Sequence, residues 1–511
     1  MRRRRLAARI CALAAGLVSV AVPSAATAQI PGLPGLPIIG DPQPPPDVQE
    51  FSGGAATPKP VGTFPIPRHP HMAPNGLSNI HADGYQTDTY AWGGPLGPNI
   101  QVSSSLFFRE CASPSLDSHG RILVICVGLD RPIATMLDPV TLEVLATYEL
   151  PPRNASANPF RDFTGGGYFY VDNEDRIVTP TSTRHVFVLA EAEGPDFELV
   201  RDYDLSAVVP QGDGIISALP DWDGRLWFAS SKGVVGWVDP ASGQVTSRSL
   251  GEGITNSFAV DDSGGVFIVT DRALYRFDAR KGGVAETWRV AYENSGVAKP
   301  GQSDAGSGTT PTILGRNYVA IADNADPMQV VVVRRAAEPK SDRRKGKRRR
   351  RGGRYRVACR QPVFEPGAGS TDQSLIVAGR SIVVENNYGY TGPLSVAQGR
   401  TTTPGLERVD LRKRGKGCRT VWHSEETAPS VVPKLSLANG LVYTYTKPPR
   451  NDSADVWYLT AIDFHTGETV WRRLAGTGLG FNNNFAPVTL TPDGTAYVGV
   501  LGGIVRFADA P

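Results

Sequence analysis

The chain has 511 residues, with 53 Lys and Arg against 50 Asp and Glu, so its formal net charge is only +3. Its 56 Gly, 42 Pro and 4 Met, with no long 3.6-residue apolar periodicity after the first thirty residues, exclude a mainly helical protein. Short runs rich in Val, Ile, Tyr, Phe and Thr alternate with Gly, Asp, Asn and Pro turns, which predicts an all-β chain.

The first 28 residues have the pattern of a secretory signal peptide. Arg2 to Arg5 are followed by an apolar run from Ile10 to Val22 and by the small residues of Ala26 to Ala28, which would leave Gln29 first. Cys11 lies inside the apolar run without a lipidation context. No later run approaches the roughly twenty apolar residues of a membrane-spanning helix. We expect a protein exported to the periplasm or the extracellular space.

Residues 29–74 carry thirteen prolines. Proline cannot donate to a β-ladder, so this stretch is expected to be a linker or an arm lying on the surface. The globular part, residues 75–511, is expected to be a single domain.

Turn signals recur along this domain at intervals of about forty to sixty-five residues, the spacing of propeller blades. An apolar strand follows each of them directly. The turns are Asp117–Gly120, Asp172–Asp175, Asp221–Gly224, Asp261–Gly264, Leu314–Asn317, Val377–Arg380, Leu437–Gly440 and Thr491–Gly494. Eight such units predict an eight-bladed β-propeller.

The last unit provides only about three strands before the chain ends, and an open ring would expose an unpaired edge. Residues Tyr85 to Trp92 alternate with period two and precede the first unit. We therefore expect this N-terminal strand to pair with residues 484–508 and close the propeller.

Four cysteines remain after Cys11 is removed, and an even number in an exported protein favours disulfides. Cys111 and Cys126 are equidistant from the turn at Asp117–Gly120, so they should face each other across two antiparallel strands. Cys359 and Cys418 are then paired by elimination.

A resemblance to a known family rests on Ala461 to Trp471, which reads A-I-D-F-H-T-G-E-T-V-W. The pattern A-x-D-x-x-T-G-x-x-x-W is similar to the tryptophan-docking repeat of the PQQ-like, quinoprotein alcohol dehydrogenase-type propellers. Asp239 and Gly243 keep the turn without the Trp. The resemblance implies eight blades over roughly residues 75 to 508.

Enzymes of that family hold the quinone PQQ against a disulfide between adjacent cysteines and beside a calcium ion. No two cysteines are adjacent here. Since the cofactor carries the chemistry, the sequence argues against PQQ and ranks a PQQ-dependent dehydrogenase third.

Polar loops are expected on the propeller face where strands two and three of each blade are joined. Their carboxylates and amides would suit calcium better than zinc. The candidate metal ligands are Asp323, Asn324, Asp326, Glu385 and Asn386, with His185 as a candidate base. The alternative is that these Asn and Asp residues only form turns.

The links between blades open on the same face, and their polar residues are candidates for ligand binding: Asn294, Asp304, Asn482 and Asn483. The seven histidines are scattered and no G-x-S-x-G motif is present, so the sequence does not support acyl transfer of the hydrolase type.

Residues 334–356 hold thirteen basic and two acidic side chains. They separate two apolar strands, so a disordered hairpin insertion is expected, which could contact an anionic polymer of the cell envelope. Aromatic residues do not interleave the run before Tyr355, so nucleic-acid binding is not expected. A solvated loop with no partner is the alternative.

The resulting hypothesis is an exported, monomeric binding or scaffold module whose polar loop face engages an extracellular or envelope ligand. The alternative is a calcium-dependent hydrolase or lyase at the channel mouth. The sequence identifies no substrate, cofactor or partner.

Overall fold

The computed structural model of the chain describes residues 44–128, 130–153, 160, 162, 164–194, 196–338 and 356–510. The predicted signal peptide, the start of the Pro-rich stretch and residues 339–355 of the basic insertion lie outside these residues.

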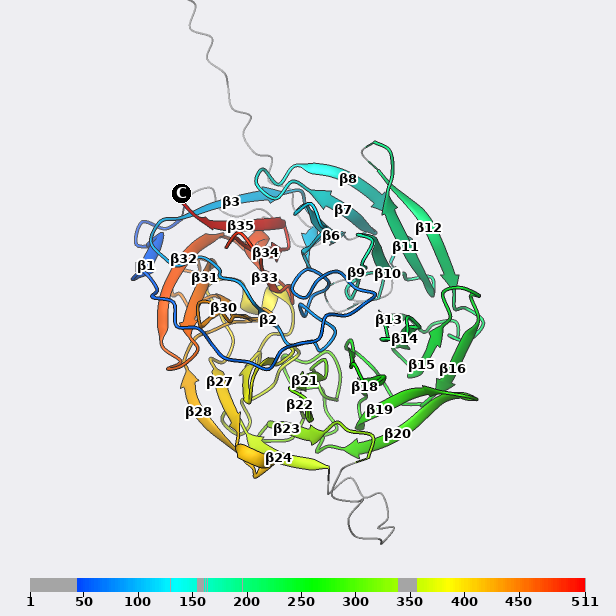
Figure 1. Cartoon of the computed structure of the whole chain (residues 1–511). Coiled ribbons are helices and arrows are strands. Elements are labelled where there is room, and N and C mark those ends of the chain that lie inside the picture. Colours follow the sequence, from blue (N-terminus) through cyan, green and yellow to red (C-terminus); the bar gives the residue numbers. More distant parts are fainter. Residues whose placement is uncertain are drawn as a thin grey trace, which may run out of the picture.

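The strands of the described residues form eight sheets arranged around a central axis (Figure 1). The predicted eight-bladed β-propeller is therefore confirmed. Three short 3-10 segments are present at Pro393–Val396, Lys413–Gly415 and Leu479–Phe481, and the described residues contain no α-helix.

Blades one to four follow in chain order. Blade one is β4 (Glu110–Cys111), β5 (Ser115–Leu116), β6 (Ile122–Val127), β7 (Pro132–Leu137) and β8 (Val144–Glu149). Blade two is β9 (Tyr170–Val171), β10 (Ile177–Pro180), β11 (His185–Glu191) and β12 (Phe197–Asp204). Blade three is β13 (Ile215–Pro220), β14 (Leu226–Ser230), β15 (Val234–Val238) and β16 (Val245–Ser249). Blade four is β17 (Ala259–Val260), β18 (Gly265–Val269), β19 (Ala273–Arg280) and β20 (Gly283–Ala291).

Blades five to eight complete the ring. Blade five is β21 (Thr312–Leu314), β22 (Tyr318–Ala322), β23 (Gln329–Arg334) and β24 (Val357–Pro362). Blade six is β25 (Ile376–Ala378), β26 (Ser381–Glu385), β27 (Leu406–Leu411) and β28 (Cys418–Ser424). Blade seven is β29 (Lys434–Ser436), β30 (Leu441–Thr446), β31 (Val456–Asp463) and β32 (Thr469–Thr477), with β1 (Phe51–Gly53) and β2 (Thr89–Tyr90) at its two edges. Blade eight is β33 (Val488–Leu490), β34 (Ala496–Val500), β35 (Gly503–Asp509) and β3 (Ile100–Leu106).

The turn between the first two strands of blades one to four is built on an aspartate. In blade one, Asp117 Oδ1 accepts hydrogen bonds from the backbone N–H groups of His119 at 2.9 Å and Arg121 at 2.8 Å. Gly120 takes a φ of 81°, which a residue without a Cβ adopts without strain. The same bonding recurs at Asp172, Asp221 and Asp261.

The segment that resembles the tryptophan-docking repeat joins β31 to β32 in blade seven. Asp463 Oδ1 accepts from the His465 N–H at 2.7 Å, and Gly467 takes a φ of 80°. Trp471 is fully buried, with its ring centroid 6.1 Å from that of Tyr443. The turn thus directs a large apolar side chain into the interior of the blade.

The prediction that Tyr85–Trp92 pairs with the last blade and closes the ring is wrong. Within Tyr85–Trp92, only Thr89 and Tyr90 form a strand, and they pair in parallel with β29 of blade seven. Gln86 and Asp88 have φ values of 59° and 56°, which break an extended strand. The fourth strand of blade eight is instead β3, which pairs with β35 over seven residues.

Residues 69–92, which we term the channel segment, cross the inner ends of the blades. The backbone carbonyls of Ser78, Gly84, Tyr85, Thr87 and Asp88 accept from N–H groups of the inner strands of blades two, four, five, six and seven, at 2.7 to 3.1 Å. Most of this segment is buried. It therefore satisfies strand edges that would otherwise face an open channel.

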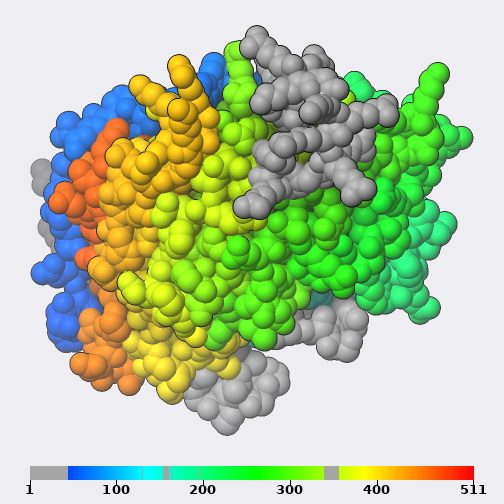
Figure 2. All heavy atoms as spheres, turned by 90° about the horizontal axis from the view of Figure 1, so that it is seen from below, coloured from blue at the N-terminus to red at the C-terminus, as the bar shows by residue number. Residues whose placement is uncertain are grey.

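The preceding residues form an arm along blade seven. The Lys59 and Val61 N–H groups donate to the carbonyls of Asn439 and Leu437, each at 2.8 Å, and β1 pairs with β32. In the side view, blue N-terminal residues accordingly lie next to orange and red ones (Figure 2).

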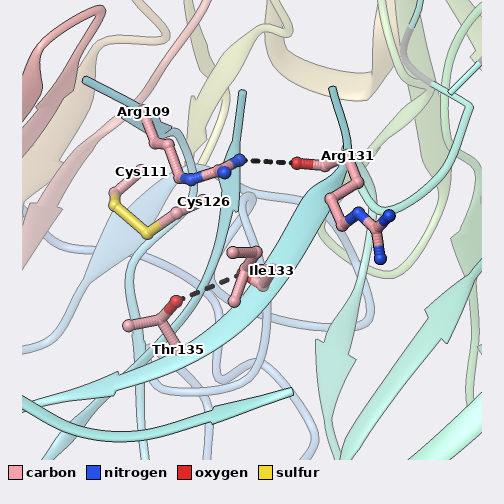
Figure 3. The surroundings of a disulfide bond; sticks show 6 residues. All are labelled: Arg109, Cys111, Cys126, Arg131, Ile133 and Thr135. Carbon is pink, nitrogen blue, oxygen red and sulfur yellow. Dashed lines mark hydrogen bonds between the residues drawn. A yellow bond between two sulfur atoms is a disulfide. The ribbon is translucent and has the colours of Figure 1, made fainter. Parts of the chain in front are cut away.

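Both predicted disulfides are formed. Cys111 on β4 faces Cys126 on β6, with their Cα atoms 4.0 Å apart, and Arg109 donates to the Arg131 carbonyl beside them (Figure 3). Cys359 on β24 joins Cys418 on β28, which links the outer strands of blades five and six.

Candidate functional site

A cavity of about 70 Å³ lies where the links between blades meet the central channel. Its walls come from β4, from the channel segment and from six of the inter-blade links. Elements far apart in sequence are therefore brought together here by the circular arrangement of the blades.

Glu110, on β4, is the acidic group at one wall. Its Oε2 accepts from Asn484 Nδ2 at 3.2 Å, whereas Oε1 is buried without a hydrogen-bond partner among the described residues. Burial raises the pKa of Glu110 to about 8, against the opposing effects of the Asn484 hydrogen bond and the Arg153 charge.

Two hydroxyl groups on the same walls, like Glu110 Oε1, are buried without a hydrogen-bond partner in the described part of the chain. They are Ser113 Oγ and Ser303 Oγ. Buried polar groups in folded proteins are almost always paired with protein, water or a ligand.

Arg153 provides the positive charge of the cavity. Its Nη2 donates to the Asp162 carbonyl, and its Nε lies 3.9 Å from Asp162 Oδ2. Burial lowers the pKa of Arg153, and the Asp162 and Glu110 charges oppose this effect. Asp162 Oδ1 is held in turn by the Thr164 N–H at 3.0 Å and by its hydroxyl at 2.6 Å.

The channel segment contributes His81. Its Nδ1 lies 3.0 Å from Asp88 Oδ1, and its Nε2 lies 3.1 Å from Thr310 Oγ1 and 3.4 Å from Ser374 Oγ. Asp88 also forms a buried ion pair with Lys434. Burial lowers the pKa of His81, although the Asp88 carboxylate acts in the opposite direction. His81 and Ser374 both line the cavity.

His185, the predicted base, lies on β11 and not on the cavity wall. Its Nδ1 is 2.6 Å from Asp202 Oδ1, across the pair formed by β11 and β12. This is a partly exposed contact between two side chains on the outer part of blade two.

The four predicted ligand-binding residues form hydrogen bonds mainly with backbone groups around them. Asn294 Nδ2 donates to the carbonyls of Asp271 at 2.7 Å and Ala305 at 2.6 Å, and Asp304 Oδ1 accepts from the Ala305 N–H at 2.7 Å. Asn483 Nδ2 donates to the Ala486 carbonyl at 2.9 Å.

Asn482, the fourth, is fully buried. Its Oδ1 accepts from the Asn484 N–H and from the Tyr390 hydroxyl, both at 3.0 Å. Of this stretch of three asparagines, only Asn484 is on the cavity wall.

The predicted metal ligands fall into two groups. In blade five, Asp323 Oδ1 accepts from the N–H groups of Ala325 and Gln329, and Asn324 Nδ2 donates to Asn294 Oδ1 and to the Val297 carbonyl. Burial raises the pKa of Asp323 to about 7. Asp326 Oδ1 accepts from the Gly367 N–H at 2.7 Å.

In blade six, Glu385 accepts from Asn387 Nδ2 at 2.9 Å and from the Thr444 hydroxyl at 3.2 Å. Asn386 Nδ2 donates to the carbonyls of Ala368 and Pro404. Among the described residues, no three His, Cys, Asp or Glu side chains gather as a metal ion would require. Calcium binding stays a prediction from the sequence.

The cysteines do not fit the quinone site that the resemblance implies. That site uses a disulfide between adjacent residues, whereas both disulfides here join different strands. We therefore derive no chemistry from PQQ.

The sequence reasoning missed the residues that line the cavity. Glu110 immediately precedes Cys111, so the predicted disulfide placed Glu110 on an inner strand. No sequence pattern, however, indicated that the Glu110 side chain faces the channel. His81 could not be recognised, because its partners Thr310 and Ser374 lie 229 and 293 residues away in the chain.

No protein-family model matches the sequence. An uncharacterized protein of Archaeoglobus fulgidus is 28% identical over 327 residues, which cover 59% of this chain and 62% of that protein. The match thus spans less than two thirds of that relative.

Solved structures with a similar fold include BamB from Moraxella catarrhalis, with 12% identity and a TM-score of 0.48 over 80% of this chain and 97% of that one. The computationally designed Ika8 protein has 12% identity and a TM-score of 0.46, covering 80% and 98%. Streptogramin B lyase has 8% identity and a TM-score of 0.38, covering 82% and 99%. At these identities the likeness concerns the fold alone.

Over the described residues, no helix has the length and apolar character needed to cross a bilayer.

Proposed function

We propose that this chain is an exported β-propeller that binds a small polar ligand in the cavity at the end of its central channel. The single observation that supports this most is a set of three buried polar atoms on the cavity walls, Glu110 Oε1, Ser113 Oγ and Ser303 Oγ, none of which has a hydrogen-bond partner within the described part of the chain. A ligand that hydrogen-bonds to them would offset the free-energy cost of burying them. We therefore propose the cavity, rather than the outer loops, as the place of binding.

The size and lining of the cavity limit the ligand. A volume of about 70 Å³ is several times the ~10–15 Å³ that one buried water molecule needs, so a ligand of a few non-hydrogen atoms fits. The signal-peptide pattern and the two disulfides support export to an oxidising compartment, where such a ligand would be met.

The test is thermal unfolding of the mature protein with small diols, amino alcohols and hydroxy acids. A ligand present at 100 times its Kd stabilises the native state by about 2.7 kcal/mol, which a melting curve resolves. Ser113→Ala removes one unpartnered group and should weaken binding by about 1 kcal/mol, or roughly fivefold.

Ser249→Ala, on the exposed outer strand β16, is the matched control and should bind as the wild type does. If no compound shifts the melting temperature of the folded protein, ordered water alone satisfies these groups and the proposal fails.

A further inference from the structure

We propose that Ser374, His81 and Asp88 form a hydrolytic triad that cleaves small acyl esters in the channel cavity. This inference rests on the proposed function, because the substrate must enter the same cavity. The three residues come from two separate parts of the chain: His81 and Asp88 from the channel segment, and Ser374 from the link between blades five and six.

The contacts define the tautomer of His81. Both oxygens of Asp88 lie within hydrogen-bond distance of Nδ1, at 3.0 and 3.2 Å. A carboxylate only accepts, so Nδ1 carries the proton and Nε2 presents its lone pair to the cavity side. Ser374 Oγ lies 3.4 Å from this nitrogen, a separation that can shorten when a substrate binds.

Thr310 Oγ1 is closer to Nε2, at 3.1 Å, but its proton has another acceptor. The Tyr168 hydroxyl donates to Asn256 Oδ1 at 3.1 Å, which leaves its oxygen able to accept. A hydrogen bond with Thr310 lowers the pKa of Tyr168, as a donor to that oxygen would, and we infer that Thr310 is the donor. This leaves the lone pair of Nε2 for Ser374. The Thr310 N–H donates to Ser374 Oγ at 3.1 Å and orients the Ser374 hydroxyl proton toward His81.

The Asp88 carboxylate favours transient protonation of the His81 ring, whereas the Lys434 charge opposes it. Asp83, Asp88 and Lys434 are all buried. The Asp83 and Asp88 charges influence each other, and burial raises the pKa of Asp83 to about 7. Below pH 7 Asp83 is therefore mainly neutral, which leaves the Asp88 carboxylate as the charge that favours the imidazolium.

The reaction is an acyl transfer to water. Ser374 Oγ bonds to the acyl carbon while its proton moves to His81 Nε2. The carbon–alkoxy bond then breaks and the alkoxide takes that proton, which releases the alcohol. Water next bonds to the acyl carbon and gives its proton to Nε2, the carbon–Oγ bond breaks, and Oγ regains the proton, which releases the acid. Ser303 Oγ lines the same cavity and lacks a partner among the described residues, so it is the candidate donor for the oxyanion.

The experiment uses methanesulfonyl fluoride, a serine-directed reagent small enough for the cavity. We expect intact-mass analysis of the mature protein to show one methanesulfonyl group, and peptide mapping to place it on Ser374. Ser374→Ala should lose the label. Ser257→Ala, a buried serine bonded to Ser217 and not on the cavity wall, should label as the wild type does. Hydrolysis of ethyl acetate should follow the same pattern, and melting curves should establish that each variant is folded.

The pH profile separates a base from a merely buried histidine. Since the pKa of His81 lies below its usual value of about 6.5, the labelling rate should be half-maximal below pH 6.5. Folded Asp88→Asn protein, which lacks the charge that favours the imidazolium, should move this midpoint to lower pH.

Thermal shifts without labelling would overturn the triad and leave ligand binding intact. If neither a thermal shift nor labelling is observed, ligand binding in the cavity and the triad are both overturned. Labelling elsewhere, or labelling that survives Ser374→Ala, would also overturn the triad.

Discussion

At the scale of single residues, buried ionisable groups lie around the channel, and burial is the main cause of their displaced pKa values. The pKa values of Glu110, Asp83 and Glu385 are raised, and that of Lys434 is lowered. Each such group favours its neutral form, in contrast to exposed acids that gain stability from ionising. The channel is therefore a region whose stability depends on pH.

Glu110→Gln tests this dependence. The folded-state pKa of about 8 lies above the ordinary Glu value of about 4.5, so between these values the folded state holds a proton that the unfolded state has released. The stability contributed by protonated Glu110 is present below about pH 4.5 and is lost as the pH rises through 8. One pKa unit corresponds to about 1.4 kcal/mol, so Glu110→Gln should be more stable than the wild type at pH 9 by at least about 1 kcal/mol and similar to it at pH 4.5.

Denaturant unfolding at the two pH values measures this difference. The other displaced groups are present in both proteins, so comparing variant with wild type isolates Glu110. Glu198→Gln, at an exposed position of β12, is the control and should show the same difference at both pH values. An equal effect of Glu110→Gln at pH 4.5 and pH 9 would contradict the assignment.

At the scale of elements, the blades could be predicted because their turns are local. Asp117 bonds backbone N–H groups two and four residues ahead, so the turn is encoded within five residues. The same local bonding accounts for two of the predicted site residues: Asn294 Oδ1 and Asn386 Oδ1 each accept from the backbone N–H group two residues ahead. A polar residue in a loop is thus a poor indicator of function unless its own backbone leaves it unpaired.

The disulfide between β24 and β28 connects two neighbouring blades. It closes a loop of 59 residues, for which the chain-entropy model gives a stabilisation of about 4 kcal/mol. Cys359→Ala/Cys418→Ala should lower the free energy of unfolding by up to that amount, measured by denaturant unfolding under non-reducing conditions. Cys359→Ala alone breaks the same bond and should cost a similar amount. A double variant as stable as the wild type would show that the link adds nothing to the ring.

At the scale of the whole molecule, the channel segment depends on contacts that no local pattern reveals. Residues 69–92 follow a Pro-rich stretch and contain no regular strand longer than two residues, yet their carbonyls complete the inner strands of five blades. Residues Tyr85–Trp92 alternate like an edge strand, but all except the last two are buried because they fill the channel. Their partners are set by closure of the ring, which a sequence shows only indirectly.

Ring closure itself can be tested by removing β35. This strand lies between β34 and β3 and pairs with β3 over seven residues. Truncation after Gly502 therefore leaves β3 unpaired in its sheet and β34 paired with β33 alone. The fully buried side chains of Val498 and Val500 would then lie at an open edge. We expect loss of the cooperative unfolding transition and rapid proteolysis at 25 °C. Removing β1 is the matched control: it pairs over only three residues with the outer edge of blade seven, so its loss should leave a cooperative transition. A truncated protein that melts cooperatively near the wild-type temperature would mean that the ring holds together without its closing strand pair.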